Sequence, residues 1–204
     1  MLWYKPTTPD KIQSLPWLHA DAIDALEKIL QPSFEVCEFG GGGSTLWLAE
    51  RVNWVSTYEP DISWLKAIDK EITNGELFLS DNPPTVERKY DLLFIDGEPV
   101  EKRRDWIKAA PQIVKPGGFM VLDNANRPEY AKERALLDAE LFYTVNGNDE
   151  ISKYLITEFY LMKGSDNESR KQPKQTTGRR EAEPGGSRGG NALAEFDRVS
   201  LEAV

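Results

Sequence analysis

The side chains of this 204-residue chain that could do chemistry together are carboxylates, each placed after a short apolar run. They are Glu38, Glu59, Asp81, Asp96 and, with an amide beside it, Asp123-Asn124. If the apolar runs are parallel strands, these side chains lie at the carboxyl edge of one sheet, where doubly wound folds bind ligands. A carboxylate there can accept hydrogen bonds from two ribose hydroxyls, and Glu59, which follows Gly40 by 19 residues, suits that role.

A run of four glycines, Gly40 to Gly43, separates a short buried strand from the start of a helix. Consecutive glycines permit positive φ and let a ligand approach the main chain closely. Ser44 is expected to cap the helix, whose free N–H groups face the same space. The turn therefore predicts a ligand site built from Gly40, Gly41, Gly42 and Ser44, and the alternative is a flexible surface loop.

Strands and helices alternate along the chain, which predicts a parallel sheet covered by helices on both faces. The expected strands are 35–39, 54–59, 76–80, 90–96, 119–123, 141–145 and 154–162. The expected helices are one from Ser14 to Pro32 and others at 44–51, 62–72, 100–114 and 128–139. A hairpin joining the last two strands suggests one antiparallel strand at the far edge of the sheet.

The composition changes at Gly164, after which Gly, Ser, Arg, Gln and Pro dominate. We therefore expect one folded domain over residues 1–163 and a disordered tail over 164–204. Cys37 is the single cysteine, which excludes a disulfide framework within the chain. No apolar run is long enough for a signal peptide or a membrane span, so the expected setting is cytoplasmic, with no membrane partner.

The net charge of −9 falls on residues 1–163, which hold 18 basic and 27 acidic side chains. Such a body repels a phosphate backbone, so nucleic acid is predicted to be an unlikely partner. An NAD(P)-dependent oxidoreductase is one reading of the glycine turn, but its G-x-G-x-x-G pattern, counted from Gly40, needs glycine where Thr45 stands. S-adenosylmethionine has no phosphate and bears positive sulfonium and ammonium groups, which suit an acid-rich edge better.

The segment from Glu38 to Thr45 (E-F-G-G-G-G-S-T) resembles motif I of the class I S-adenosylmethionine-dependent methyltransferases. Three more segments follow in that family's order: Tyr58-Glu59-Pro60, Tyr90–Gly97 and Lys115-Pro116-Gly117-Gly118. The resemblance covers residues 20–163 and implies a Rossmann-like, mostly parallel sheet of seven strands in the order 3-2-1-4-5-7-6. It places the cofactor on Glu38, Gly40, Gly41, Gly42, Ser44, Glu59 and Asp96, with Asp81 near the adenine amine.

The resemblance implies methyl transfer from S-adenosylmethionine to an acceptor, which we expect to be an oxygen atom of a small molecule. Asp96 is the expected catalytic or substrate-orienting carboxylate. A non-catalytic binding module with the same fold is the alternative from another class, and the oxidoreductase is a third. The oligomeric state is left open.

Asp96, Asp123 and Asn124 also resemble the Asp…Asp-Asn arrangement of the metal-dependent catechol and caffeoyl-CoA O-methyltransferases. Oxygen donors of this kind suit Mg²⁺, which would lower the pKa of a substrate hydroxyl and hold it facing the methyl group. The alternative is that Asp123-Asn124 simply ends a strand and caps the turn that follows.

Overall fold

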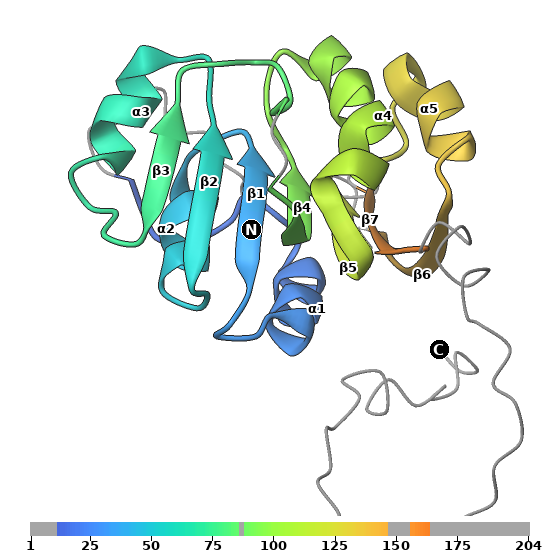
Figure 1. Ribbon diagram of the computed structural model, residues 1–204, viewed down its shortest axis with the longest axis horizontal. Helices are drawn as coiled ribbons and strands as arrows, with labels where there is room; N and C mark the ends of the chain where they lie inside the picture. Colours follow the sequence, from blue (N-terminus) through green and yellow to red (C-terminus); the bar gives the residue numbers. More distant parts are fainter. Residues whose placement is uncertain (1–11, 86–87, 147–155, 164–204) are drawn as a thin grey trace, which may run out of the picture. The chain divides into compact units, whose positions relative to one another are not determined.

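The computed structural model describes residues 12–85, 88–146 and 156–163, so the predicted tail over 164–204 lies outside the described residues. Within them, seven strands form one sheet in the order β3-β2-β1-β4-β5-β7-β6 (Figure 1). The strands are β1 Glu35–Phe39, β2 Trp54–Tyr58, β3 Gly75–Phe78, β4 Tyr90–Ile95, β5 Val114–Leu122, β6 Ala139–Asn146 and β7 Ile156–Met162. The strand order implied by the sequence is confirmed.

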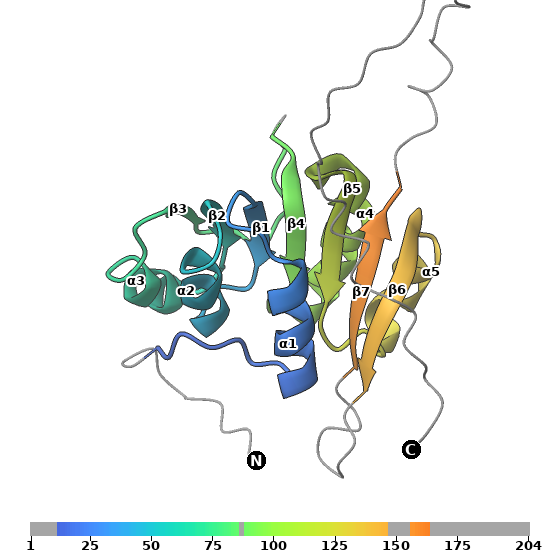
Figure 2. The ribbon, with the colours of Figure 1, turned by 90° about the horizontal axis from the view of Figure 1, so that it is seen from below.

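Helices cover both faces of the sheet, with α1, α2 and α3 on one side and α4 and α5 on the other (Figure 2). Their bounds are α1 Ala20–Ile29, α2 Gly43–Ala49, α3 Ile62–Ile68, α4 Arg103–Ile113 and α5 Ala131–Ala135, with 3-10 turns η2 Val100–Lys102 and η3 Pro128–Tyr130. None of the helices in the described part of the chain is long and apolar enough to cross a membrane.

Strand β4 shows how the two cores arise, because its buried side chains alternate between faces. Leu92 and Phe94 pack into the cluster that holds Leu26 of α1, whereas Leu93 and Ile95 pack into the cluster that holds Trp106 of α4. The continuous apolar run is therefore explained by burial on both faces, as expected for a central parallel strand.

Some of the expected elements differ from the observed ones. The first helix begins at Ala20 and not at Ser14, because Pro16 biases Leu15 away from helical geometry and the Nδ1 of His19 accepts from the Asp21 N–H as the cap. The fifth strand begins at Val114, ahead of the glycine turn that was expected to precede it. The antiparallel strand is β7, which lies between β5 and β6 and not at the edge.

Aromatic side chains cover the α4 face of the sheet near β3, since no helix occurs in the described residues between β3 and β4. Tyr58 and Phe78 stack with ring centroids 4.5 Å apart, and Phe39 and Trp106 stack at 4.9 Å. The indole N–H of Trp106 donates to the Asp81 carbonyl at 3.1 Å. These contacts hold α4 beneath the carboxyl ends of the strands, which fixes where Arg103, the first residue of α4, can reach.

Candidate functional site

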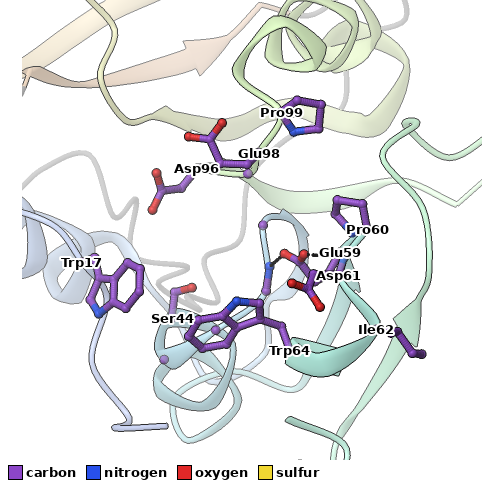
Figure 3. A pocket seen from close by; sticks show the side chains of 15 residues that line it. Trp17, Ser44, Glu59, Pro60, Asp61, Ile62, Trp64, Asp96, Glu98 and Pro99 are labelled. Atoms are coloured by element: carbon purple, nitrogen blue, oxygen red, sulfur yellow. Dashed lines mark hydrogen bonds between the residues drawn. The ribbon is translucent and has the colours of Figure 1, made fainter. Parts of the chain in front are cut away.

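A cavity of about 690 Å³ opens at the carboxyl ends of β1, β2 and β4 (Figure 3). Its lining comprises Trp17, residues 40–44, residues 59–62, Trp64 and residues 96–99. The volume is within the range of small-molecule and cofactor sites. Most of the predicted site residues meet here, namely Gly40, Gly41, Gly42, Ser44, Glu59 and Asp96.

The glycines of the turn have different structural roles. Gly40 has φ +101°, and a Cβ built on it would lie 2.4 Å from the Cα of Gly97, so only glycine fits. A Cβ on Gly41 or Gly43 would also collide with neighbouring atoms. Gly42 is different, because its φ of 174° is ordinary extended backbone and its Cβ would meet only Trp64, at 4.0 Å. Gly42 is therefore the position where the turn leaves space for a ligand.

Glu38 lies beneath this turn, fully buried and outside the cavity lining. Three hydroxyls donate to its carboxylate: Ser44 at 2.6 Å, Thr45 at 2.6 Å and Thr57 at 2.8 Å. Burial raises the pKa of Glu38 to about 7, although these three hydrogen bonds act in the opposite direction. The position of Glu38 indicates that it holds the turn in shape from below.

The cap expected from Ser44 is not formed, because α2 begins at Gly43 and Ser44 lies inside its first turn, where its hydroxyl donates to Glu38. Helix α2 begins at Gly43, and Thr45 performs the capping role by accepting from the Gly42 N–H through its Oγ1 at 3.0 Å.

Glu59 ends β2 and ties the glycine turn to α3. One carboxylate oxygen accepts from the Gly41 N–H at 2.9 Å, and the other accepts from the Asp61 N–H at 2.8 Å. Asp61 in turn caps α3 by accepting from the Ser63 N–H. Glu59 is largely buried but lines the cavity, so its carboxylate is fixed in direction at the ligand space.

Asp96 lines the cavity from the end of β4, with a buried guanidinium behind it. Arg103 is 2% exposed and donates to the Asp96 Oδ1 at 3.1 Å and to the Asp96 carbonyl at 2.7 Å. The same guanidinium donates at 2.8 Å to the carbonyls of Gly97 and Asp123. Arg103 therefore joins the ends of β4 and β5 into one rigid floor.

Asp123 lies beside Asp96 within this floor, close enough for each carboxyl group to influence the ionisation of the other. Burial raises the pKa of both groups, and the charge of Asp123 raises that of Asp96 further, whereas Arg103 opposes the increase at both. The Thr157 hydroxyl donates to the Asp123 Oδ1 at 2.7 Å, which favours the ionised form of Asp123. Asp96 is therefore the more basic of the two carboxyl groups.

The oxygen atoms expected to bind Mg²⁺ already have hydrogen-bond partners. Asp96, Asp123 and Asn124 do come together, but their side-chain oxygens already accept from Arg103, from Thr157 and, for Asn124, from Arg127 at 3.3 Å. Within the described ranges, no group of three His, Cys, Asp or Glu side chains could hold a metal ion. A buried guanidinium beside these oxygens repels a second cation, so the residues do not fit Mg²⁺.

Asp81 stands apart from the other predicted site residues. Its Oδ2 pairs with the Lys102 Nζ at 3.4 Å, and it is not among the described residues that line the cavity. Conversely, the lining includes residues that the sequence analysis did not single out, among them Trp17, Trp64 and Glu98, and Arg103 lies buried behind Asp96. For Trp64 a signal existed, because it falls in the first turn after Glu59-Pro60-Asp61.

No protein-family model and no curated protein matches the chain, but solved structures do. An rRNA methylase from Streptococcus thermophilus has a TM-score of 0.57 at 17% identity, covering 71% of this chain and 95% of its own. A ribosomal protein L11 methylase from Lactobacillus delbrueckii subsp. bulgaricus has 0.59 at 15%, covering 79% and 91%. The N-methyltransferase NodS from Bradyrhizobium japonicum WM9, in complex with S-adenosyl-L-homocysteine, has 0.53 at 12%, covering 64% and 79%.

These likenesses confirm, for the fold, the resemblance to class I methyltransferases that the motifs indicated. They also correct the prediction about partners. Structures with this fold are described as methylases of rRNA and of a ribosomal protein, so the expectation of a small-molecule acceptor, with nucleic acid unlikely, is wrong. The physical reason is that net charge averages over the whole body and does not define the surface that an acceptor meets.

Proposed function

We propose that this chain is an S-adenosylmethionine-dependent methyltransferase. The observation that best supports this proposal is a cavity of about 690 Å³ at the strand ends, bounded by the glycine turn and by four carboxylates. Among the lining residues that the structure describes, none is Lys, Arg or His. A ligand with positive sulfonium and ammonium groups suits that lining, whereas a pyrophosphate does not. The S-adenosylhomocysteine complex of the NodS enzyme supports the same cofactor.

The residues divide between binding and chemistry. The open main chain at Gly42 and the fixed carboxylate of Glu59 would hold the cofactor, which supplies an activated methyl group when bound. Glu38 acts through the turn that it supports. Asp96 is the proposed carboxylate beside the acceptor, because it faces the cavity and its raised pKa makes its ionised form a stronger base.

The proposed methyl acceptor is a macromolecule, which is supported by the rRNA and ribosomal-protein methylases that share the fold. A reducing compartment such as the cytoplasm is proposed from the single cysteine, Cys37, which is buried and free.

Calorimetry with S-adenosylmethionine tests the cofactor site. Glu59→Gln should weaken binding by about 1.5–3 kcal/mol, roughly 10- to 100-fold, because a carboxylate's hydrogen bonds are lost. Gly42→Arg should abolish binding while leaving the unfolding midpoint nearly unchanged, since its extended backbone accepts any residue and its side chain would fill the cavity.

The matched control is Asp81→Asn, which makes the same chemical change at a neighbouring strand end outside the cavity lining and should leave the affinity intact. Undiminished affinity in both Glu59→Gln and Gly42→Arg would overturn the proposal. Binding without any conversion to S-adenosylhomocysteine across protein and RNA acceptors would instead favour a non-catalytic binding module.

A further inference from the structure

The two ends of the cavity differ in what they offer. Glu59, Asp61 and Ile62 lie on one side, whereas Trp17 and Asp96 lie on the other, with Glu98 above Asp96 (Figure 3). The first side adjoins the glycine turn, to which Glu59 is hydrogen-bonded, and it is the side assigned to the cofactor under the proposed function. The second side, formed by Trp17, Asp96 and Glu98 and here called the acceptor end, remains for the group that receives the methyl.

The acceptor end is negatively charged even after its internal pairings are counted. Among the described residues, the cation in contact with Asp96 is that of Arg103, and it is shared with the second carboxylate of the floor, Asp123. The two carboxyl groups of the floor share that one guanidinium, and exposed Glu98 adds a negative charge at the rim. Because S-adenosylmethionine brings a single net positive charge to a lining with four carboxylates, the site stays negative when it is bound.

Trp17 adds an aromatic surface to this end. Its side chain is 40% exposed although it lines the cavity, and it meets Trp64 edge to face, with centroids 5.8 Å apart and planes at 85°. The edge-to-face contact fixes the indole in orientation. A tryptophan face beside carboxylates is a favourable environment for an ammonium group, which gains cation–π attraction as well as charge complementarity.

We propose that the acceptor is an amine nitrogen of a lysine-rich polypeptide segment, an inference that rests on the proposed methyltransferase function. The acceptor end would receive one of its ammonium groups beside the Asp96 and Glu98 carboxylates and the Trp17 ring. The ammonium gives a proton to the Asp96 carboxylate. The nitrogen lone pair then forms a bond to the methyl carbon as the carbon–sulfur bond breaks, with its electron pair remaining on sulfur.

The experiment compares three probes: a fluorescein-labelled dodecalysine peptide, spermidine and ribosomal RNA. Methyl transfer from labelled S-adenosylmethionine should reach the peptide in preference to the other two. Peptide binding, measured by fluorescence polarisation without cofactor, should weaken about two- to fivefold in Glu98→Gln, which removes one partly solvated charge. Trp17→Leu should weaken it about threefold through the lost cation–π contact.

Glu101→Gln is the matched control, because it removes the same charge three residues further on, at an exposed position outside the described lining. Equal losses in Glu98→Gln and Glu101→Gln would overturn the proposal, as would transfer to RNA with the peptide inert, or equal transfer to spermidine. The two proposals fail separately. If the parent protein does not bind S-adenosylmethionine, the proposed methyltransferase function is wrong. The peptide-binding measurements without cofactor still decide whether the acceptor end selects lysine-rich chains.

Discussion

The two buried carboxylate systems at the carboxyl edge of the sheet are stabilised in opposite ways. Beneath the glycine turn, Glu38 is held by three neutral hydroxyls. Across β4 and β5, Asp96 and Asp123 share a buried guanidinium, that of Arg103. Neutral donors leave a buried carboxylate close to protonation at neutral pH, as the pKa of about 7 for Glu38 shows. In the floor, the buried guanidinium favours the ionised carboxylates, and this stabilisation depends on a single side chain.

This difference indicates which changes should destabilise each carboxylate system. At the glycine turn the stabilisation is distributed over Ser44, Thr45 and Thr57, so the protonation state of Glu38 can change without loss of every contact. In the floor, a single residue supplies the cation beside both carboxyl groups and also donates to three main-chain carbonyls. Removing one interaction partner by substitution should therefore lower the stability of the protein most in the floor.

The largest expected effect follows from Arg103→Ala. It leaves Asp96 and Asp123 without their cation and removes a donor from three carbonyls, of which that of Asp123 keeps the Tyr130 hydroxyl, so the free energy of unfolding should fall by about 3–5 kcal/mol. Arg104→Ala is the neighbouring control, since that side chain is 49% exposed and its ion pair with Asp105 is 3.7 Å long, and it should cost less than about 0.5 kcal/mol. Urea unfolding curves with similar losses for both variants would contradict the contrast.

The same comparison explains how much was predictable. The turn end is local in sequence: a strand, glycines and a helix follow one another, so spacing alone identified Gly40 to Gly42 and Glu59 as neighbours of one site. The floor is assembled from β4, the start of α4, the end of β5 and β7, which only the tertiary fold brings together. The carboxylates Asp96 and Asp123 were identified from their strand ends, but an arginine at the start of an amphipathic helix carries no pattern that marks it as buried.

The seven-strand order was predictable because its motifs occur in sequence, whereas the helix starts depended on caps that His19 and Thr45 supply.

A second prediction concerns pH. The pKa of Glu38 is raised from 4.5 to about 7 in the folded protein, so its contribution to stability is fully present below pH 4.5 and is lost as the pH rises through about 7. Glu38→Gln removes this dependence. Between pH 4.5 and 8 the stability of the variant relative to the parent should therefore increase by about 3 kcal/mol.

Urea unfolding of both proteins across that pH range measures the difference directly, and other titrating groups cancel because they are common to both. Glu101→Gln, an exposed glutamate, serves as the control with a flat difference. A difference between Glu38→Gln and the parent that stays constant with pH would show that the carboxylate is ionised throughout, and the hydroxyl cage would then be as effective as a cation.

The smallest expected effect is that of a divalent cation on the floor. Because the guanidinium of Arg103 stands beside the oxygens that would bind it, adding millimolar Mg²⁺ should shift the thermal unfolding midpoint of the parent by less than about 1 °C, and a chelator should leave methyl transfer unchanged. Arg103→Ala reverses the electrostatics, since Asp96 and Asp123 then lack a counter-ion and Asn124 adds a third oxygen. Mg²⁺ should raise the midpoint of that variant, and the double variant Arg103→Ala/Asp123→Asn should lose the response. A clear Mg²⁺ response in the parent itself would mean that the carboxylates can exchange the arginine for a metal, and the contrast between the two carboxylate systems would no longer depend on a permanent cation.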